Sequence, residues 1–141
     1  MEPIRHQLVV ASTPVEAFDA WVDQIGRWWH PDYTPDAAGF RGAGIEPRVG
    51  GRVYLVDATL GEVVWGRVLA IARGALLVHT STLGQDPEHP SRVSVHFVPL
   101  DEGGTRVELV HGGWDEDNAG FRSKFTDWPL ILDRYAAFVA S

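Results

Sequence analysis

A run of six short β-prone segments, separated by turn signals, constrains the fold of this chain more than any other feature of its sequence. The segments are residues 41–49, 51–58, 63–72, 75–82, 92–100 and 105–112. Glycine, proline and aspartate residues separate them, and the connections are too short to hold crossover helices. Six successive strands with short connections predict an antiparallel meander rather than alternating strands and helices.

A strand and a strong helix signal precede this run. Residues 4–10 are apolar and β-prone, which predicts a first strand. Thr13, Pro14 and Glu16 then match a capping box with proline at the first helical position. After this helix, Trp28 and Trp29 are expected to fall in a short second helical turn.

A second apolar helix is expected at the C-terminus. Residues 130–139 carry apolar side chains at helical spacing, and Pro129 suits the first position of a helix that Asp127 could cap. Such a helix must bury its apolar stripe against the sheet. The sequence therefore predicts an α+β fold. One curved antiparallel sheet of about seven strands wraps around a long C-terminal helix, with two short helices after the first strand.

The last two strands allow a prediction of register. Matching their apolar faces pairs Phe97 with Leu109 and closes the hairpin at Asp101–Thr105, around a three-residue loop at 102–104. In this register His96 and His111 point to opposite faces of the sheet. A zinc site made by His79, His96 and His111 is then disfavoured, because its ligands would not converge. We expect neither a metal ion nor another cofactor.

Composition excludes several classes of function. The chain has 141 residues, no cysteine and a formal net charge of −7, and its length suits one domain over residues 1–141. Disulfides, thiolate zinc sites and cysteine nucleophiles are excluded. Its eleven arginines and Lys124 are scattered, so we expect neither nucleic acid nor a membrane surface as a partner. Without a secretion signal or a long apolar stretch, the sequence predicts a soluble cytoplasmic protein, and it allows a homodimer.

Several strings, taken in order, resemble the SRPBCC superfamily, the START and birch-pollen-allergen type of helix-grip domain. They are residues 13–21 with Trp28 and Trp29, then 46–52, 65–68, 104–111 and 127–134. The set is most similar to the branch named for homology to the activator of the heat-shock-protein-90 ATPase. Asp127 replaces the glycine that usually starts the last string. The resemblance implies a deep cavity between helix and sheet, but not one function, because members include carriers, cyclases, oxygenase domains and a co-chaperone.

The cavity is the expected site, because six tryptophans in a chain of this size suggest an aromatic lining. The side chains expected to line it come from the second short helix, the strands and the last helix. They are Trp28, Trp29, Phe40, Tyr54, Trp65, Val78, Val95, Phe97, Leu109, His111, Phe125, Trp128, Leu132 and Tyr135. The same bulky rings could instead fill the space and leave a small or closed cavity.

His111 is expected to point inward with Leu109, and a buried histidine needs a hydrogen-bond partner. The ordinary interpretation is a partner from the main chain or from Tyr135. The leading functional hypothesis is a protein that binds a small hydrophobic or aromatic molecule, with no catalytic residue assigned. One alternative is a cyclase or hydrolase that uses His111 as acid–base group with Tyr54 or Tyr135. Another is a stress-related, co-chaperone-like interaction module.

Overall fold

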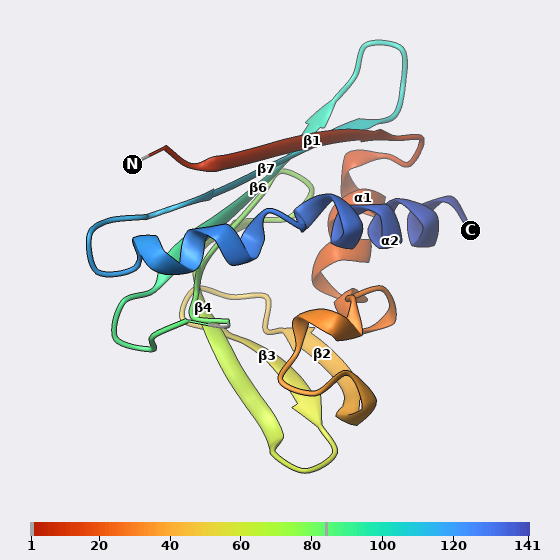
Figure 1. The fold of residues 1–141 in the computed structure, drawn as a ribbon. Helices are drawn as coiled ribbons and strands as arrows, with labels where there is room; N and C mark the ends of the chain where they lie inside the picture. The colour runs from red at the N-terminus through yellow and green to blue at the C-terminus, as the bar shows by residue number, and fades with distance from the viewer. Residues whose placement is uncertain (1, 84) are drawn as a thin grey trace.

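The computed structural model describes residues 2–83 and 85–141, and its central feature is a curved antiparallel sheet (Figure 1). Seven strands pair in the order β1-β7-β6-β5-β4-β3-β2. Their bounds are β1 Ile4–Val10, β2 Phe40–Ile45, β3 Arg52–Asp57, β4 Gly61–Ala72, β5 Leu76–Ser81, β6 Ser91–Pro99 and β7 Thr105–Gly112. The six strands after the first form the predicted meander, and β7 then pairs with β1.

Within the described residues, two α-helices and four short 3₁₀ helices flank the strands. They are α1 Pro14–Val22, η1 Ile25–Arg27, η2 Pro31–Tyr33, η3 Ala37–Gly39, η4 Ala119–Phe125 and α2 Trp128–Ala140. The capping box is confirmed at α1, where the Glu16 amide donates to Thr13 Oγ1 at 3.2 Å and the Thr13 amide donates to Glu16 Oε1 at 3.0 Å. Trp28 and Trp29 come directly after η1 rather than within a helix. No helix in the described residues is long and apolar enough to cross a membrane.

The core lies between the concave face of the sheet and α2, which crosses that face beside α1 (Figure 1). Strand residues alternate between buried and solvent-facing positions, as in Val93, Val95 and Phe97 of β6, which are at most 2% exposed. The buried residues of α2 are Trp128, Ile131, Leu132 and Tyr135. Their spacing places them on one side of the helix, which is why α2 packs against the sheet along its length.

The observed register of the β6–β7 hairpin differs from the predicted register by two residues. Phe97 pairs with Val107 rather than Leu109, and Pro99 rather than Asp101 pairs with Thr105. The connection is therefore five residues long, and Gly103 and Gly104 adopt φ values of +93° and +86°, which favour glycine. A shift of two residues leaves every side chain on its predicted face. His96 is accordingly exposed and His111 is buried, as expected.

Candidate functional site

A small pocket lies between the sheet and the N-terminal end of α2. Its walls come from the segment after η1, from η2, from β4 and β5, from the loop after β5, from η4, and from α2 with the residue before it. The lining residues are Trp29, Tyr33, Trp65, Ser81, Leu83, Phe125, Asp127, Trp128 and Ile131. The free volume is about 20 Å³, which is room for about one water molecule. The alternative that bulky rings nearly fill the interior therefore describes this structure.

Three indole rings make the aromatic part of the pocket. The Trp29 and Trp65 rings lie with centroids 5.5 Å apart at 35°, and Trp128 meets Trp29 edge-on at 6.0 Å and 82°. A β-bulge in β4 changes the direction of the Trp65 side chain. Between the pairs Val53–Gly66 and Tyr54–Val64 the register shifts, so Trp65 is the extra residue on β4. Such bulges turn a side chain away from strict alternation, and both Trp65 and Gly66 are buried.

The Trp65 indole N–H stands out because nothing in the described residues accepts its hydrogen bond, although the side chain is only 5% exposed. The other indoles of the pocket are paired. Trp29 Nε1 donates to the Tyr33 carbonyl at 3.2 Å, and Trp128 Nε1 donates to His111 Nδ1 at 3.0 Å. Trp21 is a second buried tryptophan without an acceptor, but it packs between Trp28 and Tyr135 and does not line the pocket.

A buried polar chain runs behind the pocket from Trp128 through His111 to Ser91. An indole nitrogen can only donate, so His111 Nδ1 is the acceptor and carries no proton. Nε2 of the neutral ring therefore carries the proton, and it donates to Ser91 Oγ at 2.6 Å. The Ser91 hydroxyl lies 3.3 Å from the Ser81 carbonyl and 3.2 Å from Gln85 Oε1, either of which can accept its proton.

This arrangement does not suit acid–base catalysis by His111. Nε2 cannot take a proton from Ser91 because it already holds one, and Nδ1 is occupied by Trp128. Burial, followed by the nearby His79, lowers the pKa of His111 to about 3, so the ring stays neutral at physiological pH. Neither proposed helper contacts it: the Tyr135 hydroxyl donates to the Ala17 carbonyl at 2.8 Å, and Tyr54 lies on the other face of the sheet.

His79 is a second neutral buried histidine, two strands from His111 across Val93. Its Nδ1 lies 2.7 Å from the Thr80 carbonyl and must donate to it, because a carbonyl oxygen only accepts. Burial lowers the pKa of His79 to about 4. The described part of the chain contains no group of three or more histidine, aspartate or glutamate side chains that could hold a metal ion.

A hydrogen bond between two exposed or partly exposed groups closes the mouth of the pocket. The Tyr33 hydroxyl donates to Asp127 Oδ2 at 2.8 Å and so connects η2 with the residue that precedes α2. Burial of the hydroxyl, and then this bond to a carboxylate, raises the pKa of Tyr33 to about 12. Asp127 occupies the N-cap position of α2, but its side chain makes no capping hydrogen bond there. Its carboxylate instead accepts the hydrogen bond from Tyr33 at the mouth of the pocket.

The structure brings only some of the predicted lining residues to this pocket. Trp29, Trp65, Phe125 and Trp128 line it. His111 lies behind Trp128, and the others that are buried or half-buried pack in the core away from the pocket. These are Trp28, Phe40, Val95, Phe97, Leu109, Leu132 and Tyr135.

Tyr54 and Val78 were predicted to line the cavity, but the structure places both on the outer face of the sheet. Tyr54 alternates with buried Val53 and Leu55, and Val78 alternates with buried Leu77 and His79. In both strands each parity carries apolar or aromatic residues, so the pattern alone could not tell the faces apart.

Five lining residues were not predicted: Tyr33, Ser81, Leu83, Asp127 and Ile131. Ile131 lies one helical turn after Trp128 on the buried side of α2, so helical spacing could have predicted it from Trp128. Leu83 and Asp127 come from connections between elements and Tyr33 from the three-residue helix η2, and no periodic pattern encodes the positions of such residues.

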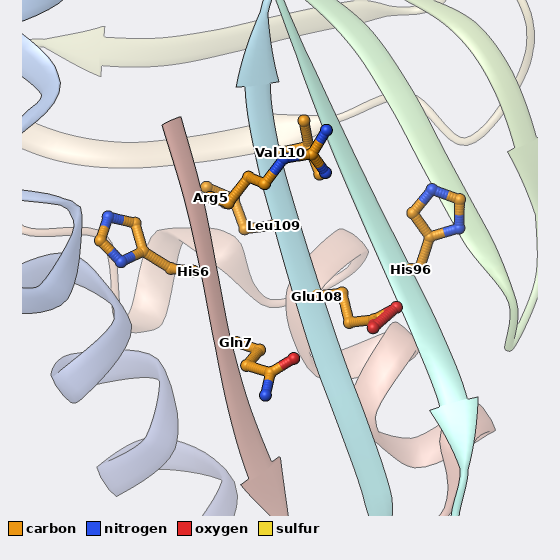
Figure 2. Close-up of a pocket in the computed structure, with 7 residues that line it drawn as sticks. All are labelled: Arg5, His6, Gln7, His96, Glu108, Leu109 and Val110. Carbon is orange, nitrogen blue, oxygen red and sulfur yellow. The ribbon is translucent and has the colours of Figure 1, made fainter. Parts of the chain in front are cut away.

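A larger hollow of about 470 Å³ lies on the outer face of the sheet (Figure 2). Its lining residues are Arg5, His6, Gln7, His96, Glu108, Leu109 and Val110. Figure 2 shows the Arg5 side chain reaching across β7 beside Val110, whereas His6 points away from the hollow. Glu108 is already paired with Arg106 at 3.2 Å. The unpaired indole N–H of Trp65 and the buried His79 and His111 lie on the inner side of the sheet, so the interior pocket is the stronger candidate.

The sheet, the terminal helix and the aromatic pocket between them define a helix-grip domain of the SRPBCC superfamily. Over residues 11–140 the chain matches the family described as activator of Hsp90 ATPase homolog 1-like protein, and it belongs to that family. Among the curated proteins none matches this chain.

Several solved structures share this fold. Protein MLL2253 from Mesorhizobium loti is similar with a TM-score of 0.73 and 19% identity, over 98% of this chain and 96% of that one. An anthrahydroquino-gamma-pyrone synthase, Txn09, described as complexed with SUM, has a TM-score of 0.68 and 31% identity, over 97% and 96% of the two chains. The Aha1 dimer from Colwellia psychrerythraea has a TM-score of 0.67 and 21% identity, over 96% and 94%.

Proposed function

We propose that this protein binds a small aromatic molecule in the pocket between the sheet and α2. The observation that carries the proposal is the pocket itself, with three indole rings, Phe125, Leu83 and Ile131 around it and few polar groups. Apolar walls with a small number of placed polar groups are typical of ligand sites. The similarity to a synthase of an aromatic compound supports an aromatic ligand.

Binding requires the walls to move, because a free volume of about 20 Å³ does not hold an aromatic ring. Tyr33 and Leu83 are only partly buried and come from connections rather than from the sheet. Displacing them loses less packing than moving the buried Trp29 or Trp128. We therefore expect the pocket to open at the mouth formed by Tyr33, Leu83 and Asp127.

Indane, an uncharged bicyclic hydrocarbon, tests this proposal by NMR titration of the indole N–H signals. We expect saturable shifts of Trp29, Trp65 and Trp128. Leu83→Ala should bind indane more tightly, because it enlarges the pocket at a partly exposed position. Leu69→Ala is the matched control, since Leu69 is 47% exposed on β4 and does not line the pocket. Absence of saturable binding in both the natural protein and Leu83→Ala would contradict the proposal.

Catalysis on an aromatic substrate in the same pocket is the second candidate, and the 31% identity to the synthase favours it. A phenyl-substituted 1,3,5-triketone is a suitable probe, because its dehydrative ring closure gives a γ-pyrone and one molecule of water. Mass spectrometry of the reaction would detect the product. Binding of the probe without turnover above the uncatalysed rate would leave only the binding role.

A homodimer is a further part of the proposal. The relative from Colwellia psychrerythraea is described as a dimer, and β1 lies at one edge of the sheet, where a second copy could pair with it. Sedimentation velocity at micromolar concentration is the test, and a purely monomeric boundary would count against it. Exposed apolar side chains such as Val9, Val49 and Leu130 are scattered over different elements, so they do not favour a chaperone-docking surface.

A further inference from the structure

We propose that Trp65 selects the ligand by donating a hydrogen bond, and that the ligand class is an uncharged aromatic molecule carrying a carbonyl or similar oxygen acceptor. This inference rests on the proposed function, because it concerns the same pocket. It adds the oxygen acceptor that the ligand must carry and the side chain that donates a hydrogen bond to it.

The first observation is the buried, unpaired indole N–H. Trp65 is 5% exposed, lines the pocket and has no acceptor for Nε1 within the described residues. A buried donor without an acceptor destabilises a protein, so most such groups are paired. A ligand that supplies the acceptor removes this cost on binding, whereas a hydrocarbon of the same shape does not.

The second observation is that the other two indole N–H groups of the pocket already donate hydrogen bonds within the protein. Trp29 donates to the Tyr33 carbonyl, and Trp128 donates to His111. Among the described lining residues, Tyr33 and Ser81 carry hydroxyl groups, and the Tyr33 hydroxyl donates its proton to Asp127. Trp65 is therefore the one tryptophan of the pocket whose indole N–H has no acceptor among the described residues, so a ligand that enters beside this ring could accept its hydrogen bond without breaking a bond of the protein.

The third observation is that the Trp65 ring is held in place. Its main-chain carbonyl accepts from the Thr82 amide at 2.8 Å, and its ring packs against Trp29 at 5.5 Å and against His79 edge-on at 5.4 Å. A donor fixed in this way loses little conformational freedom when it binds, and it imposes one direction on the acceptor.

Charge limits the ligand class further. Among the described lining residues none is an arginine, lysine or histidine, and the one charged group is the Asp127 carboxylate at the mouth. An anionic ligand would lose its hydration between the apolar walls and would face this carboxylate. A neutral ketone, quinone, ester or ether oxygen is consistent with both the donor and the apolar walls.

The test compares 1-indanone with indane, which differ by one carbonyl in place of a methylene. The two affinities are measured for the natural protein and for Trp65→Phe, which keeps an aromatic ring but has no N–H. We expect Trp65→Phe to lower the ratio of 1-indanone affinity to indane affinity by about 3- to 10-fold, the effect of one net hydrogen bond. Taking the ratio cancels the difference in hydration between the two ligands.

Two control variants make the result specific. Trp21→Phe removes the other unpaired buried indole N–H, which lies outside the pocket, and should leave the ratio unchanged. Ser81→Ala removes the neighbouring hydroxyl and should also leave it unchanged. In the natural protein, the Trp65 indole proton should lie further downfield when 1-indanone is bound than when indane is bound. This readout does not depend on any variant folding.

The outcomes separate the two proposals. If both ligands bind but Trp65→Phe leaves the ratio unchanged and the Trp65 indole proton lies no further downfield with 1-indanone than with indane, Trp65 is not the donor and only this inference is wrong. If Ser81→Ala rather than Trp65→Phe lowers the ratio, the donor is Ser81 and the assignment is overturned. If neither ligand binds, the proposed function fails as well.

Discussion

Lowering the pH should destabilise this protein through its two buried neutral histidines. His111 and His79 have pKa values of about 3 and 4 in the folded state, against 6.5 for an exposed histidine. Both shifts are caused first by burial, which disfavours the charged ring. A folded-state pKa below the unfolded value means that the unfolded state binds more protons as the pH falls. Stability is therefore full above the unfolded pKa of 6.5 and is lost as the pH falls below it.

The size of the loss follows from these values. Between about pH 7.5 and about pH 5, an unfolded histidine takes up nearly one proton while the buried ring takes up almost none. Linkage then gives a loss of about 2 kcal/mol for each histidine, or about 4 kcal/mol together. At about pH 5 the result depends mainly on the unfolded pKa, because both folded values lie below that pH.

Urea unfolding of the natural protein and of His111→Gln at the two pH values measures this contribution. Glutamine is neutral throughout, so the loss on acidification should fall from about 4 to about 2 kcal/mol, although His111→Gln is less stable at both pH values. Val93→Ala is the matched control. It lies between the two histidines and should cost about 2 kcal/mol at either pH, through lost packing alone.

The reasoning would be refuted if His111→Gln and the natural protein lost the same stability between the two pH values. A second measurement does not require the variant to fold. The imidazole signal of His111 should remain in its neutral position down to about pH 5 in the folded protein. A His111 ring that titrates in this range while the protein stays folded would also refute it.

Two further predictions concern the packing around the site. Gly66→Ala should destabilise the protein by about 1–3 kcal/mol in urea unfolding, because a Cβ at Gly66 would lie 2.2 Å from the Thr80 carbonyl oxygen. Gly42→Ala, where a Cβ meets nothing within 4 Å, should be neutral or slightly stabilising, and equal effects of the two changes would contradict the geometry. Trp128→Phe should cost about 1–3 kcal/mol, because it leaves His111 Nδ1 buried without its donor. Thermal unfolding measures this loss, and an unchanged melting temperature would mean that the bond contributes nothing.

Local sequence patterns determined the elements of this fold. Thr13 and Glu16 specify the start of α1 by hydrogen bonds that span only three residues. The alternation in Val93, Val95 and Phe97 specifies which side of β6 is buried. These signals depend on neighbours along the chain, so no tertiary information is needed to interpret them.

Tertiary structure decided how the elements meet. The β6–β7 register differs from the prediction by two residues, because a two-residue shift keeps every side chain on the same face and alternation cannot detect it. Tyr54 and Val78 lie on the outer face, because both parities of their strands are apolar and only packing selects one.

The volume of the pocket and its unpaired N–H group could not be predicted from the sequence for a similar reason. The sequence pointed to its tryptophans, but its volume also depends on Tyr33 of the short helix η2 and on Leu83 of the loop after β5, which lie far apart in the chain. The missing acceptor at Trp65 likewise depends on every group packed around that ring. Alternation and helical spacing in the sequence indicate most of the buried aromatic residues. Which of their polar atoms lack a partner, such as Nε1 of Trp21 and of Trp65, depends on the packed interior, because each hydrogen bond requires groups from distant parts of the chain to meet.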